Sequence, residues 1–574
     1  MMASSTLHNN EMLLSQGKLG HLLKLSLLLN AAEAKTYGEN HVKVQQDSKL
    51  VASNFPDIDI ELLSPAFANP NSVPAGFANG TEGPTPHATL DNFIRTIAEP
   101  NDWVTYHIPD FKSEEGRTIP YLYLSQPGSP GTANSTKLKV GIQAAIHGNE
   151  PAAEQGALAL LAKLDANQTW TATLLEKLDI ILLPRYNVDG VEYFQRELAS
   201  NLDPNRDHAK LRSQQTRGIK RLATTFSPHI VLDLHEYSAH NRGGIYQVAP
   251  DSLLSYGRNL NIHPRVRELA NDLFIKELGK GLERHGLTWE SYVTSPSWKS
   301  TPGANITLEE GGNSARSGMG AYGLLQTITI LFETRGIRLA DQHFQRRVAT
   351  QLIKLSTLLD TAVAHFDDVY STIESSIQSF INSEDDIVLS EHGSYIDRNF
   401  TFIDTTNGDI VQVPVNYSST QPSTPGLTRS RPEGYLIPRT YSELASQLVD
   451  SGLEVQTLPY GYHGAVEALN ITSVSFGTEY YEGVILATVT TEPYEKAVNL
   501  PAGSFWVSTR QRNAGLAFTT LEPEGKYSYV SFGLLPVSEG DEYPIFRVAT
   551  MDANSDTFDT ADTSLAEFGA GGFH

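Results

Sequence analysis

The sequence predicts an α/β fold with a mostly parallel or mixed sheet, followed by a separate, mainly β region. From about residue 90 to 372, short apolar runs typical of buried strands alternate with helical patterns. From about residue 385, helical patterns become rare, and alternating β-branched and aromatic runs appear between Gly and Pro residues. The 574 residues are too many for one core, so more than one domain is expected.

The periodicity places the elements in order along the chain. Strands are expected at 138–146, 178–184, 230–234 and 326–332, and helices at 152–164, near 264–285 and at 341–366. In the second region, strands are expected at 474–476, 484–489, 505–508 and 527–532. These patterns divide the chain into a signal segment (1–34), a linker or pro-segment-like lead-in (35–88), an α/β domain (89–375), a β-rich domain (385–550) and a flexible tail (551–574).

Composition excludes several classes of protein. The net charge of −23 argues against nucleic-acid binding and against an anionic membrane surface. Cysteine is absent, so any metal site must use His and carboxylate ligands. No apolar run reaches the roughly 18 residues needed to span a bilayer. Lys18 and Lys24 precede a short run of leucines and a small-residue stretch at 32–34, which favours a secretory signal and therefore an extracellular location.

Three residues at strand ends carry the strongest chemical signal. His147 and Glu150 directly follow the expected strand at 138–146, and His235 ends the expected strand at 230–234. Two imidazoles and one carboxylate are the ligand set of a catalytic zinc site that leaves a position for water. Either histidine alone would more often be a hydrogen-bonded polar residue at a strand end, but the combination favours one bound Zn²⁺.

Glu333 follows a strongly apolar strand, where an unpaired carboxylate is costly. The functional interpretation is a general base that takes a proton from zinc-activated water and passes it to the leaving amine. The structural alternative is an ion pair between Glu333 and Arg335.

Between the two ligand segments lie Arg196, Asn205 and Arg206. A guanidinium beside a zinc stabilises the oxyanion of a tetrahedral intermediate, which is the role considered for Arg196. An Asn-Arg pair can hold a terminal carboxylate. The alternative for any one of these arginines is a solvated surface charge.

The ordered motifs HGNE (147–150), NVDG (187–190), PNRD (204–207), DLHEY (233–237) and FETRG (332–336) resemble the zinc carboxypeptidase family related to carboxypeptidase A, over residues 90–370. The resemblance implies a mixed eight-stranded sheet flanked by helices. It also implies zinc ligands at His147, Glu150 and His235, a general base at Glu333, a carboxylate site at Asn205 and Arg206, and oxyanion stabilisation by Arg196.

The sequence departs from the family at several positions. The family's mobile tyrosine would fall near Gly311, where the sequence has no Tyr, and Arg316 is the substitute considered for it. The floor of the specificity pocket would fall near Gly318 and Met319, and the lack of a carboxylate there disfavours Lys or Arg specificity. Glu236 after the third ligand is unusual and is expected to support the ligands indirectly.

The leading hypothesis is a zinc metallocarboxypeptidase that removes C-terminal residues from peptides. A zinc-dependent deacylase or amidase acting on N-acyl amino acids or cell-wall peptides is the second, because a carboxylate clamp does not require a peptide. The third is a non-catalytic binding protein that uses its β-rich domain.

Overall fold

The computed structural model describes residues 35–128, 135–240, 242–299 and 305–549. The predicted signal segment and the predicted tail from residue 551 lie outside the described residues. Within these ranges, no helix combines the length and the apolar character that a membrane span requires.

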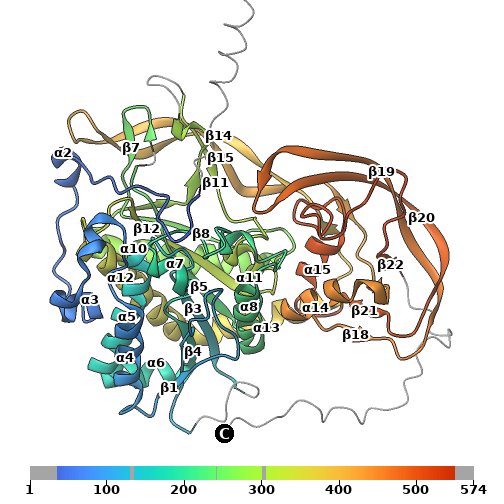
Figure 1. Cartoon of the computed structure of the whole chain (residues 1–574), viewed down its shortest axis with the longest axis horizontal. Helices are drawn as coiled ribbons and strands as arrows, with labels where there is room; N and C mark the ends of the chain where they lie inside the picture. Colours follow the sequence, from blue (N-terminus) through green and yellow to red (C-terminus); the bar gives the residue numbers. More distant parts are fainter. Residues whose placement is uncertain (1–34, 129–134, 241, 300–304, 550–574) are drawn as a thin grey trace, which may run out of the picture. The chain divides into compact units, whose positions relative to one another are not determined.

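A mixed eight-stranded sheet forms the centre of the first region (Figure 1), which confirms the predicted fold class. Its order is β1 (Val104–His107), β2 (Tyr121–Leu124), β4 (Leu178–Leu183), β3 (Leu138–Ala144), β5 (Ile230–Ser238), β12 (Ile328–Ile337), β8 (Ser252–Tyr256) and β9 (Trp289–Ser291). The central strands β4, β3, β5 and β12 run parallel to one another, and β2 and β8 flank them in antiparallel orientation. The carboxyl ends of these four strands therefore meet at one edge, where open sheets bind ligands.

Helices cover both faces of this sheet. Helices α5 (Pro151–Ala166) and α12 (Phe344–Ala364) pack together over one face, where Glu236 accepts hydrogen bonds from the Ala152 amide of α5 and from Arg347 of α12. Helices α8 (Gln214–Phe226) and α11 (Gly318–Gly323) lie on the other, beside Gly141 and Val231. Because successive side chains of a strand alternate between faces, His235 points away from the α5–α12 layer.

The loop after β3 requires a glycine. A Cβ atom at Gly148 would lie 2.0 Å from the carbonyl carbon of Gly190, so no larger residue fits where the two chain segments cross. This close approach brings the turn that carries His147 and Glu150 against the segment after β4.

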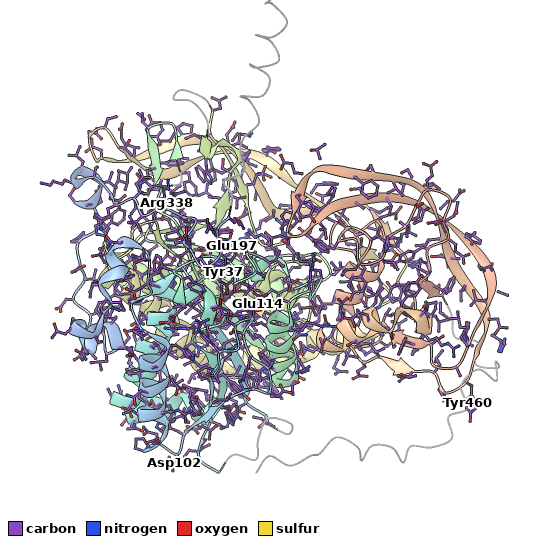
Figure 2. All side chains as sticks on the ribbon, in the orientation of Figure 1. Tyr37, Asp102, Glu114, Glu197, Arg338 and Tyr460 are labelled. Atoms are coloured by element: carbon purple, nitrogen blue, oxygen red, sulfur yellow. The ribbon has the colours of Figure 1, made fainter. Side chains whose placement is uncertain are left out.

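Beyond this sheet, the described residues form two six-stranded sheets and one two-stranded sheet, and most of their strands lie in the β-rich region. β14 (Glu391–Asp404) and β15 (Ile410–Pro425) pair in one six-stranded sheet, and the long β19 (Tyr462–Tyr481) and β20 (Val484–Leu500) pair in the other (Figure 1). Tyr460, which is 73% exposed, projects from the surface of the β-rich region (Figure 2).

Two features of the β-rich region differ from the sequence-based expectation. Residues 527–532 form turns rather than a strand, because the adjacent side chains of Tyr529 and Val530 are both buried, as is Phe532, and they do not alternate between two faces. The region also holds two helices that the sequence pattern did not predict, α14 (Ser442–Asp450) and α15 (Ala514–Leu521).

The segment before the first long helix, α4 (His87–Ala98), is anchored to the α/β region by a buried ion pair. Asp47 accepts hydrogen bonds from both terminal nitrogens of Arg335, at 2.6 and 2.9 Å. Burial alone would raise the pKa of Asp47, but the imidazole of His343 and the Arg335 guanidinium outweigh it and hold this pKa well below its usual range. Arg335 is therefore paired with Asp47 and not with Glu333.

Asp47→Asn should lower the free energy of unfolding at pH 7 by about 3 kcal/mol, because it leaves the Arg335 charge buried without a counter-ion. A carboxyl with a lowered folded-state pKa stabilises the fold above its unfolded pKa of about 3.9, and this contribution is lost as pH falls towards the folded pKa. The difference between wild type and variant should therefore shrink below about pH 4 in denaturant titrations. Asp57→Asn, at an exposed site in the same segment, is the control. An equal effect of both variants would contradict the anchoring role.

Candidate metal centre and active site

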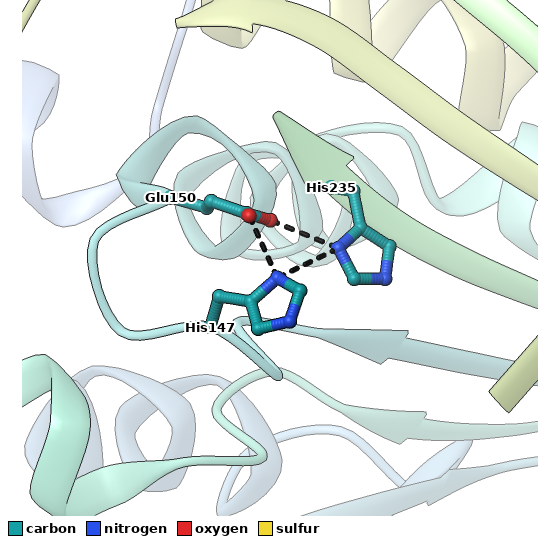
Figure 3. Close-up of side chains that lie close together, drawn as sticks. All are labelled: His147, Glu150 and His235. Carbon is teal, nitrogen blue, oxygen red and sulfur yellow. Dashed lines mark hydrogen bonds and ion pairs between the residues drawn. The ribbon is translucent and has the colours of Figure 1, made fainter. Parts of the chain in front are cut away.

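The predicted ligands His147, Glu150 and His235 converge at the carboxyl ends of β3 and β5 (Figure 3). The Glu150 carboxylate lies 2.7 Å from His147 Nδ1 and 2.9 Å from His235 Nδ1, and the two Nδ1 atoms lie 3.2 Å apart. All three side chains are buried. Two imidazole nitrogens that face each other beside a carboxylate require a shared proton or a cation, and this donor set fits zinc.

Two further carboxylates orient the imidazoles. Asp203 lies 3.1 Å from His147 Nε2, and Asp233 lies 3.1 Å from His235 Nε2. When each Nε2–H donates to its carboxylate, each Nδ1 keeps its lone pair for a metal ion. Burial alone would lower the pKa of His235, but Asp233 and Glu150 raise it well above its usual value. A metal ion at this site therefore replaces a tightly held proton.

Glu333 lies on β12 directly opposite His235 in the parallel register, so both side chains point to the same face. It lines the same cavity as the three ligands, and its buried Oε2 has no hydrogen-bond partner among the described residues. Burial raises the pKa of Glu333 to about 8. An unpaired carboxyl beside a ligand cluster has the position and the high proton affinity of a general base.

The three polar residues between the ligand segments also meet at the site. Arg196 donates to Asp203 at 2.9 and 3.1 Å and lies 3.3 Å from Glu150, so its charge is compensated. Asn205 accepts a hydrogen bond from the Gly318 amide at 2.7 Å. The Arg206 guanidinium donates to the Asn205 carbonyl at 2.8 Å and has no carboxylate partner among the described residues.

These side chains line one cavity of about 340 Å³. Met319 and Arg316, considered for the pocket floor and for substrate capping, also line it. Position 311 is a glycine where the family's mobile tyrosine was expected. A Cβ atom at Gly311 would lie 2.9 Å from the ring of Tyr292, which also lines the cavity. A phenol therefore occupies this part of the site from a different position in the chain.

Sequence reasoning did not assign a role to Asp203, Asp233 or Tyr292. The two aspartates each precede a predicted site residue by two positions, and in the strand β5 this spacing places Asp233 on the same face as His235. Asp233 also lines the cavity and lies behind Gly318, where a Cβ atom would be 3.0 Å from its Oδ2. Glu236 supports the ligands indirectly, since it forms an ion pair with Arg347 and accepts the Ala152 amide next to Glu150.

A buried His-Glu-His cluster that could hold a metal ion, with two aspartates beside its imidazoles and a buried glutamate at the same cavity, fits a zinc hydrolase. Residues 91–230 match the family model described as zinc carboxypeptidase. The chain is 49% identical to carboxypeptidase 2 of Trichophyton equinum and 48% identical to that of Trichophyton rubrum, each over 92% of this chain and 98% of the relative. A metallo-carboxypeptidase structure from Burkholderia cenocepacia also matches, at 16% identity and a TM-score of 0.38, over 49% of this chain and 69% of that one.

The chain belongs to the zinc carboxypeptidase family, because its likeness to these relatives extends over nearly their whole length. It is accordingly a zinc metallocarboxypeptidase.

Asp233→Asn should weaken zinc binding by roughly 10- to 100-fold, because an amide holds the His235 tautomer less firmly than a carboxylate does. Competition with a chromophoric chelator measures this affinity, and a thermal melt of the zinc-loaded variant checks that the fold is intact. An unchanged zinc affinity would show that Asp233 does not orient the ligand.

Proposed function

We propose that this protein releases single residues from the free C-terminus of peptides, with His147, Glu150 and His235 holding one zinc ion. The observation that carries the proposal is the position of Glu333. Its unpartnered carboxyl lies opposite His235 in the strand register and faces the cavity that contains Arg196 and Arg206. One cavity therefore brings together Glu333 as a base, Arg196 as an oxyanion partner and Arg206 as a carboxylate-binding residue.

Each residue has a defined task in this proposal. A zinc ion held by His147, Glu150 and His235 would supply the Lewis acidity that polarises the scissile carbonyl and activates water. Glu333 accepts the proton of the attacking water and delivers it to the leaving amine nitrogen. Arg196, fixed by Asp203, balances the negative charge that develops on the carbonyl oxygen. Arg206 and Asn205 bind the terminal carboxylate and so align the last peptide bond with the base.

Glu333→Gln should retain zinc and substrate binding but lower kcat by about 10²- to 10⁴-fold, because the amide cannot accept the proton. The measurement pairs metal analysis with the rate of C-terminal residue release. Near-normal turnover with full zinc content would eliminate Glu333 as the base.

Arg206→Ala should raise KM for peptides with a free C-terminus by roughly tenfold or more, because a charge-assisted contact to the carboxylate is lost. Hydrolysis of the same peptides with an amidated C-terminus, already slow, should change little. Arg265→Ala serves as a control, since Arg265 is exposed and does not line the cavity. A similar loss on free and amidated peptides would indicate a general structural effect instead.

A second candidate activity is hydrolysis of N-acyl amino acids. The favouring observation is that Arg206 and Asn205 would recognise any terminal carboxylate, whether or not it belongs to a peptide. Comparing a dipeptide blocked at its N-terminus with an N-acyl amino acid of the same C-terminal residue separates the two substrate classes. Preference for the N-acyl amino acid would replace the peptide proposal.

We also propose that the protein is secreted. The support is the basic and leucine-rich sequence before residue 30 and the small residues at 32–34. Recovery of the protein from the culture medium, with an N-terminus near residue 35, is the expected result. Retention of the full-length chain inside the cells would contradict secretion.

A further inference from the structure

The tip of the β19–β20 hairpin contacts residues 203–210 of the α/β region, the segment that contains Asn205 and Arg206. The hairpin turns at Glu482 and Gly483, whose φ angles of 47° and 83° are those of a tight two-residue turn. The Asp203 amide donates to the Glu482 carboxylate at 2.8 Å, and Lys210 Nζ donates to the Glu482 carbonyl at 3.0 Å. The β-rich region is thus joined directly to the residue that orients both His147 and Arg196.

The same tip places an aromatic ring against a cavity-lining arginine. The guanidinium carbon of Arg316 lies 5.0 Å from the centre of the Tyr481 ring. Burial raises the pKa of Tyr481 to about 12, and the charges of Arg316 and Arg206 act in the opposite direction. The buried Tyr481 hydroxyl has no hydrogen-bond partner among the described residues.

Arg316 differs from Arg196 in its lack of a counter-ion. Arg196 is paired with Asp203 and Glu150. Within the described parts of the chain, Arg316 forms no ion pair, and its buried Nε has no hydrogen-bond partner. A guanidinium is always charged, and a partly buried charge is costly unless it is paired. An arginine left unpaired at the wall of a binding cavity is therefore suited to an anionic group of the substrate.

We propose that Arg316, held against the Tyr481 ring by the tip of the β19–β20 hairpin, is a second carboxylate-binding residue of the substrate cavity. Its ligand is a carboxylate of the C-terminal residue, supplied either by the α-carboxylate or by an acidic side chain. The planar guanidinium can donate two parallel hydrogen bonds to either group. Tyr481 is a positioning residue in this arrangement, since it acts through Arg316. The inference rests on the proposed function and deepens it.

Binding is measured by calorimetry in the zinc-loaded Glu333→Gln background, so that the result does not depend on turnover. The probes are N-acylated dipeptides that end in Glu, in Gln, or in Gln amide. Arg316→Gln should weaken binding by about tenfold or more. Loss for both free-acid probes identifies the α-carboxylate as the ligand, and loss for the Glu probe alone identifies the acidic side chain. Unchanged affinity for both free acids would overturn the proposal.

The contribution of the hairpin is tested in the same background. Tyr481→Phe retains the ring and should bind like the parent, whereas Tyr481→Ala should weaken the same probes that Arg316→Gln weakens. The two losses should not add in the double variant, because both act on one contact. Tyr480→Ala is the matched control, since Tyr480 is 76% exposed on the same hairpin. If Tyr481→Ala and Tyr480→Ala behave alike, the hairpin does not position Arg316.

The outcome separates this inference from the proposed function. If the wild-type enzyme releases no C-terminal residue but the Arg316 variants lose affinity for the free acids, the cavity binds carboxylates and the peptidase proposal fails alone. If the wild-type enzyme is active and the variants bind like the parent, the role of Arg316 fails and the peptidase proposal stands.

Discussion

The parallel pairing of β5 with β12 is the constraint on which the site depends. It sets Glu333 opposite His235, so the spacing of these two residues is set by the backbone hydrogen bonds of the sheet. β3 lies on the other side of β5 and delivers the turn that carries His147 and Glu150. A slip of one residue in either pairing would move a functional side chain to the α5–α12 face, where Glu236 and Arg347 form a structural ion pair.

Local sequence patterns predicted the parts of the site that lie at the ends of apolar strands. His147, His235 and Glu333 were singled out because two imidazoles and carboxylates combined at the ends of buried strands match the donor set of a zinc site. The resemblance to a known family then assigned Arg196, Asn205 and Arg206, and the structure brings all three to the same cavity.

Contacts between residues distant in sequence could not be predicted in this way. Arg335 pairs with Asp47, 288 residues earlier, and the Asp203 amide bonds Glu482, 279 residues later. Periodicity reports which face of an element is buried, and it carries no information about which distant charge will lie beside it. For the same reason the absence of tyrosine at Gly311 gave no indication that the ring of Tyr292 fills that place.

The charges around the candidate metal ligands link the metal site electrostatically to the protonation state of Glu333. Glu150, Asp203, Asp233 and Glu333 are buried together, and Arg196 is the guanidinium paired with two of these carboxylates. Burial raises the pKa of Glu333 to about 8, and Glu150 acts in the same direction, whereas the charges of His235, Arg196 and Lys354 act against it. A zinc ion that displaced the proton held at His235 would still add positive charge beside Glu333 and would favour its ionised form. If Glu333 is the base, as proposed, filling the metal site would make it readier to accept a proton, and metal occupancy would be coupled to catalysis through electrostatics.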